Sequence, residues 1–87
     1  MKLYLMWCHG EDGPEELRAT TNRSMITDLL MIDSDGWSRG SFELAKSRLD
    51  DLMQKTDAEL SEQDGIHPLM RGWGGLHLQV TDLFDVK

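Results

Sequence analysis

The chain opens on a segment, residues 2–8, whose apolar side chains have the composition of a β-strand. Successive residues of a strand point to opposite faces of a sheet. Both faces are apolar here, with Leu3, Leu5 and Trp7 on one and Tyr4, Met6 and Cys8 on the other. The pattern predicts a central strand that is covered on both sides, or on one side by this chain and on the other by a partner.

Two further segments alternate between apolar and polar residues. Residues 16–22 predict a half-exposed strand after the loop at residues 9–15, so the first two strands would form a hairpin. Residues 76–84 predict a closing strand. The segment before it, residues 66–75, contains three glycines and a proline, which predict an ordered loop.

The middle of the chain has the spacing of apolar residues that is typical of helices. Asn22 or Ser24 can cap a first, short helix that ends in the turn at residues 33–36. Its predicted inward face consists of Met25, Leu29 and Ile32. A second, longer helix begins near Ser38 or Ser41. Its apolar stripe consists of Phe42, Ala45, Leu49, Leu52 and Met53.

A third helix is predicted by a capping box, in which a Ser or Thr and the Glu three residues later bond to each other's backbone. Thr56 and Glu59 have this spacing, and Gly65 would end the helix after about residue 63. The order of elements is therefore β-β-α-α-α-β. We expect one α+β domain over residues 1–87, in which a three-stranded sheet with the first strand at its centre carries the helices on one face.

Composition changes this picture mainly through charge. The 87 residues carry a formal net charge of −7, and residues 50–64 contain six acidic side chains against Lys55 alone. Phosphates repel such a surface, which disfavours sequence-independent binding to nucleic acid or to anionic lipid. A single cysteine suits a reducing compartment, and no apolar run approaches the ~20 residues that span a bilayer. We therefore expect a cytoplasmic protein without membrane association.

The residues that could carry chemistry lack the spacing that chemistry needs. Asp33 and Asp35 resemble the start of an EF-hand loop, but the later calcium ligands are missing. The thiol and imidazole ligands are Cys8, His9, His67 and His77. They do not occur in the paired spacing of zinc sites, and adjacent strand residues do not face each other as a Cys–His catalytic pair must. We therefore expect no enzymatic activity, no metal and no cofactor.

The acidic segment is the strongest candidate for a binding surface. We expect its carboxylates to meet a partner protein with a basic surface, with Trp37 and Arg39 as hot-spot side chains. The carboxylates are Asp50, Asp51, Asp57, Glu59 and Glu62. The alternatives are a solvated helical face for the acids and a lid on the core for Trp37. Because the capping box divides the segment between two helices, the surface requires that both parts turn to the same side.

In size and charge, and in lacking a catalytic motif, the chain is similar to the accessory inhibitors that bacteriophages encode, anti-CRISPR proteins among them. The similarity implies an inhibitor that mimics nucleic acid and occupies the nucleic-acid-binding groove of its target. One alternative is a homo-oligomer, such as a homodimer, that pairs through the last strand as an exposed edge. Another is a regulator that binds a small molecule or a metal around His67, Trp73 and His77.

Overall fold

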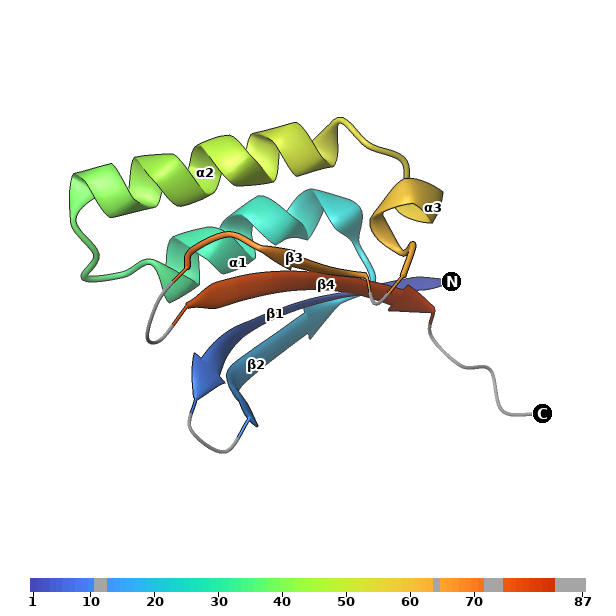
Figure 1. Ribbon diagram of the computed structural model, residues 1–87, viewed down its shortest axis with the longest axis horizontal. Helices are drawn as coiled ribbons and strands as arrows, with labels where there is room; N and C mark the ends of the chain where they lie inside the picture. Colours follow the sequence, from blue (N-terminus) through green and yellow to red (C-terminus); the bar gives the residue numbers. More distant parts are fainter. Residues whose placement is uncertain (11–12, 64, 72–74, 83–87) are drawn as a thin grey trace.

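The computed structural model describes residues 1–10, 13–63, 65–71 and 75–82, and every structural statement below refers to these residues. They form an α+β fold in which the helices α1 and α2 lie on one face of an antiparallel sheet (Figure 1). The strands are β1 (Lys2–Gly10), β2 (Gly13–Thr20), β3 (Ile66–Pro68) and β4 (Leu76–Asp82). The helices are the 3-10 turn η1 (Arg23–Met25), α1 (Ile26–Asp33), α2 (Arg39–Met53) and α3 (Asp57–Leu60).

The sheet has four strands in the order β2-β1-β4-β3. β1 lies between β2 and β4, so the predicted central place of the first strand is confirmed. The predicted number of three strands is wrong, because β3 pairs with β4 inside the segment that we expected to be a loop. Three residues are too few to show alternation, and only the pairing with β4 makes them a strand. The last strand therefore has a neighbour on each side and is not an edge of the sheet.

One apolar core fills the space between the sheet and the helices. Its buried members from the strands are Tyr4, Met6, Leu76, Leu78 and Val80. Its buried members from the helices are Ile26, Leu30, Ala45, Leu49 and Leu60. Because side chains alternate along β1, Leu3, Leu5 and Trp7 point to the face of the sheet that is turned away from α1 and α2.

The inward face of the second helix is confirmed, and that of the first is not. The stripe of α2 packs against the core over its whole predicted length, through Phe42, Ala45, Leu49, Leu52 and Met53. In α1 the buried side chains are Ile26 and Leu30; of the predicted face, Leu29 packs against the core, whereas Met25 and Ile32 are exposed. Apolar side chains occur around most of this short helix, so the sequence allowed more than one inward face.

The predicted helix boundaries depend on caps that the structure contains. Ser38 caps α2 by accepting a hydrogen bond from the Ser41 amide, and the capping box of Thr56 and Glu59 is present at α3. α3 ends at Leu60, earlier than predicted. The chain then turns at Gly65, which has a φ of 65° and passes so close to the Val80 carbonyl that a Cβ atom would collide with it.

Candidate functional site

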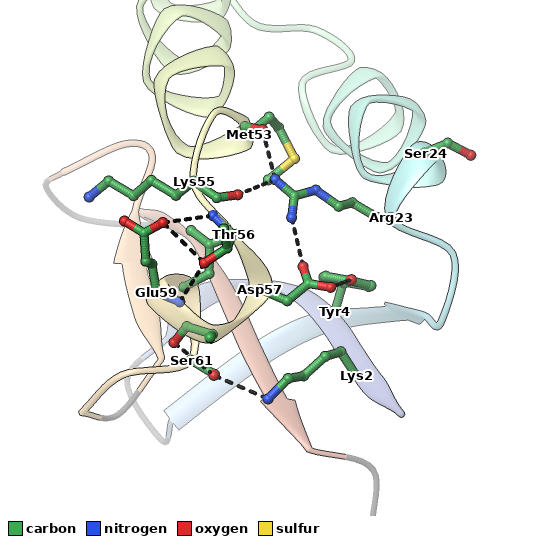
Figure 2. Close-up of polar contacts among 12 residues, drawn as sticks. Lys2, Tyr4, Arg23, Ser24, Met53, Lys55, Thr56, Asp57, Glu59 and Ser61 are labelled. Atoms are coloured by element: carbon green, nitrogen blue, oxygen red, sulfur yellow. Dashed lines mark hydrogen bonds and ion pairs between the residues drawn. The ribbon is translucent and has the colours of Figure 1, made fainter.

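Asp57, one of the predicted binding carboxylates, is engaged inside the protein. Tyr4 Oη donates to its Oδ2 at 2.8 Å, and Arg23 Nη1 donates to its Oδ1 at 2.7 Å. Arg23 Nη2 also donates to the carbonyl of Met53 at 2.7 Å, at the end of α2, and to that of Lys55 at 2.5 Å, in the turn that follows. We name these contacts the Arg23 latch. They join β1, η1, the end of α2 and the start of α3 (Figure 2).

The latch changes the acidity of Tyr4. Burial, followed by the hydrogen bond and the negative charge of Asp57, raises the pKa of Tyr4 above its ordinary value of 10.0. The hydroxyl therefore remains a donor over a wider range of pH. Asp57 thus has a structural role through its contacts with Tyr4 and Arg23, although its side chain is still 36% exposed.

Glu59 is also engaged, in the capping box. Its Oε1 accepts from the Thr56 amide at 3.1 Å and from Thr56 Oγ1 at 3.0 Å. These hydrogen bonds lower the pKa of Glu59, the backbone bond more than the hydroxyl bond. Figure 2 shows Asp57 turned toward Arg23 and Tyr4, while Glu59 lies on the other side of α3. The two acids of this helix therefore do not share a face.

The remaining carboxylates of the acidic segment differ in their surroundings. Asp50 forms an ion pair with Lys46, one helical turn away on α2, with Nζ and Oδ1 2.6 Å apart. Asp51 and Glu62 are exposed and make no ion pair with the described residues. The structure thus does not gather the five predicted carboxylates into one unoccupied surface, because three of them have partners within the protein.

Trp37 and Arg39 have different environments. The side chain of Trp37 is half-buried and packs against the core, as the lid interpretation predicts. Arg39 is 91% exposed and its Nε lies 3.0 Å from Glu43 Oε1. An exposed ion pair of this kind contributes little to stability, so Arg39 remains available to a partner.

The face of the sheet opposite the helices is a second candidate surface, which lies outside the acidic segment. We name it the open face; its apolar side chains are Leu3, Leu5, Trp7, Leu17, Ala19 and Ile66. Cross-strand pairing places Leu5 beside Ala19 and Gln79, and Gln79 beside Ile66. None of the described elements lies over this face (Figure 1).

Leu17 belongs to the open face and lies next to a bulge in β2. The β1–β2 register shifts between Met6 and Cys8, and Glu16 takes a φ of 51°. Beyond the bulge, Arg18 points to the helix side, where its Nε lies 2.7 Å from Asp33 Oδ1. Leu17 precedes Arg18 and points the other way, and its side chain is 58% exposed.

At one end of the open face, Trp7 stacks on His77 with ring centroids 4.5 Å apart. Burial, followed by the nearby His9, lowers the pKa of His77. The indole Nε1 of Trp7 and the Nδ1 of His77 are buried without a hydrogen-bond partner among the described residues. This end of the face is therefore more enclosed than the part around Leu17.

Two members of the alternative site for a metal or a small molecule, His67 and His77, lie on opposite faces of the sheet. His67 pairs with Leu78 on the helix side of the sheet, whereas His77 pairs with Trp7 on the open face. Trp73 lies outside the described residues. Within the described ranges, no three His, Cys, Asp or Glu side chains lie close enough together to hold a metal ion.

Cys8 is poorly suited to act as a nucleophile. Burial, followed by the charge of Glu16, raises the pKa of its thiol. The thiol Sγ lies 3.9 Å from Glu16 Oε2. Because the thiolate is the reactive form, this surrounding disfavours catalysis by Cys8.

No family model, curated protein or solved structure matches this chain. In the described part of the chain, no helix combines the length and the apolar character that crossing a membrane requires.

Proposed function

We propose that the protein is a non-enzymatic domain that binds another protein through the open face of its sheet. The observation that supports this most is the face itself, which carries apolar side chains on three strands and has no described helix over it (Figure 1). Apolar patches on soluble proteins commonly mark interaction sites. Leu17 and Ile66, which are 58% and 42% exposed, are the side chains that a partner would bury.

The charge of the chain indicates the chemistry of the partner. Beside the formal net charge of −7, six exposed carboxylates have neither an ion pair nor a capping role among the described residues. They are Glu15, Glu16, Asp28, Asp35, Asp51 and Glu62. A field of this sign attracts a basic surface and speeds association with it. The partner is therefore a protein whose apolar patch is bordered by Lys and Arg, as on proteins that bind nucleic acid.

The narrower form of the proposal is an inhibitor of the bacteriophage type that covers the nucleic-acid-binding surface of its target. It rests on the length and acidity of the chain. Glu62, which has no ion-pair partner among the described residues, would contribute directly to the interface. Asp51 has no such partner either, but it lies on α2, on the other side of the sheet from the open face, so it would contribute through the overall field. Asp50, Asp57 and Glu59 would contribute mainly through the overall field, because each already has a partner.

Two double variants with matched exposure test the open face. Leu17→Ser/Ile66→Ser removes side chains that are 58% and 42% exposed on the open face. Met25→Ser/Met31→Ser removes side chains that are 42% and 56% exposed on η1 and α1. Affinity isolation from the native host with each variant identifies a protein that the first loses and the second retains. With that protein purified, the first variant should weaken binding at least about tenfold, as loss of interface side chains does.

The salt dependence of binding, and competition by nucleic acid, distinguish the possible kinds of partner. Binding to the purified protein should weaken as salt rises, and nucleic acid should compete with it. Equal loss of binding with both double variants would contradict the open-face interface. A stable dimer of the wild-type chain in sedimentation, unaffected by salt and abolished by Leu17→Ser/Ile66→Ser, would instead assign the face to a second copy of this chain.

A further inference from the structure

A groove with a charge opposite to that of the whole molecule lies between the second half of α2 and residues 67–71. Its volume is about 300 Å³. The charged and titratable side chains that line it are Arg48, Asp51, Lys55, His67 and Arg71. They come from two segments that are distant in sequence, so the fold is needed to bring them together.

This groove contains the Lys and Arg side chains that form no ion pair with another described residue. Five of the Lys and Arg side chains are in ion pairs, namely Lys2, Arg18, Arg23, Arg39 and Lys46. The other three that the structure describes are Arg48, Lys55 and Arg71, and all three line the groove. The groove is therefore locally basic on a chain with a net charge of −7.

Two of the lining side chains are held in place by backbone carbonyls. Arg48 Nη1 donates to the Leu69 carbonyl at 3.2 Å, which leaves its other N–H groups for a ligand. His67 Nε2 lies 2.6 Å from the Leu60 carbonyl. A carbonyl can only accept, so Nε2 carries a hydrogen and the second ring nitrogen remains for another partner. The site is thus partly organised before any ligand binds.

We infer that this groove binds a phosphate monoester group, either esterified or as inorganic phosphate. The lining carries three cations and one carboxylate, a net charge that matches a dianion. Arginine guanidinium groups bond to phosphate oxygens in pairs, and lysine adds a point charge. A long nucleic acid is disfavoured, because its further phosphates would meet the negative field outside the groove. None of the residues that line the groove belongs to the open face, and Asp51 is shared only with the negative field that the proposed function invokes, so the two proposals can be tested separately.

Titration of the 87-residue chain at low salt, followed by NMR of the backbone amides, tests the inference. Adenosine monophosphate and inorganic phosphate are the two probes, and both should cause saturable shifts at Arg48, Lys55, His67 and Arg71. Tighter binding of the nucleotide would show that the ester group is also contacted. Equal binding would show that the phosphate alone is recognised.

A pair of double variants supplies the control. Lys55→Gln/Arg71→Gln should raise the dissociation constant for adenosine monophosphate at least about tenfold. Arg39→Gln/Lys46→Gln makes the same change in net charge outside the groove and should leave it within about twofold. Leu17→Ser/Ile66→Ser should also leave phosphate binding unchanged, whatever it does to protein binding.

Three results would overturn the inference. The first is the absence of saturable shifts up to about 10 mM of either probe, which is weaker than any specific site of this kind. The second is an equal loss of binding in the two charge variants, which would indicate attraction by overall charge. The third is tighter binding of a single-stranded oligonucleotide without terminal phosphates, which would assign the groove to a polymer backbone.

Discussion

The Arg23 latch gives its tyrosine a property that can be measured directly. Tyr4 is the only tyrosine of the chain. Its hydroxyl is bonded to a carboxylate, and burial is the largest cause of its raised pKa. The folded state therefore holds the phenol proton more tightly than the unfolded state does. The resulting stabilisation is complete below pH 10 and is lost as the pH rises through the folded-state pKa.

We expect the absorbance of Tyr4 near 295 nm to titrate above pH 10 in the folded protein and near pH 10 in urea. Asp57→Asn should lower the folded-state pKa of Tyr4, because the negative charge is removed. The pKa should stay above its ordinary value, because burial remains. A wild-type titration at or below the value in urea would contradict the hydrogen bond between Tyr4 and Asp57.

The helices and strands differ in how far the sequence predicts them, and the reasons are local. α2 has apolar residues on one side and charged residues on the other, so only one orientation buries its stripe. α1 has apolar residues around most of its circumference, so its inward face follows from the packing of its neighbours. β3 has three residues and forms only where β4 offers a partner. Capping patterns at Ser38 and Thr56 involve neighbouring residues alone, which is why they could be predicted.

The turn that leads from α3 into β3 depends on Gly65. Ala at this position would need a positive φ and would place its Cβ against the Val80 carbonyl, which belongs to the backbone and cannot move aside easily. Gly36 is a matched control, because its φ of 85° is also positive but the space around it is open. Gly36→Ala should cost about 1–2 kcal/mol, the price of the left-handed conformation alone. Gly65→Ala should cost about 3 kcal/mol or more.

Urea unfolding of the two glycine variants measures the difference. A larger loss of stability in Gly65→Ala than in Gly36→Ala is the expected result. Equal losses would mean that the backbone at residue 65 can shift away from β4 without cost, and that the close approach to Val80 does not define the turn.

At the scale of the whole molecule, the Arg23 latch holds the helical layer to the sheet. Arg23→Ala should lower the free energy of unfolding by about 1–3 kcal/mol, because it leaves two carbonyls and one of the two Asp57 carboxylate oxygens without their donor. The two charged side chains are 31% and 36% exposed, so the loss should fall below that of a fully buried pair. Arg23→Lys should recover less than half of it, since one ammonium group does not reach three acceptors arranged around a planar guanidinium.

Arg39→Ala is the control for the loss of one exposed ion pair, and it should cost less than about 0.5 kcal/mol. Urea unfolding of the three variants makes the comparison. An equally small effect of Arg23→Ala and Arg39→Ala would show that the latch contributes no more than a surface pair.

The candidate sites were less predictable than the fold, because they depend on which charged side chains form ion pairs with residues distant in the sequence. The acidic segment is evident in the sequence, but nothing there shows that Asp57 would meet Arg23, which is 34 residues away. The same holds for the groove, whose cations belong to distant segments of an acidic chain. The open face did leave a signal, since the first strand has no polar side. That signal indicated that both sides of the strand are buried. The structure shows which side the helices cover, and the other side is the open face that a partner would bury.

The position of Asp57 has a consequence for mutagenesis. A scan that reverses every acidic residue between 50 and 64 would lower the amount of folded protein at Asp57, and at Glu59 through the capping box. In an affinity isolation, this loss of folded protein would reduce the recovered partner in the same way as the loss of an interface contact. Of the five predicted carboxylates, only Asp51 and Glu62 can be exchanged without removing an ion-pair or capping partner among the described residues, so a loss of binding at these two positions reports on the surface rather than on the scaffold.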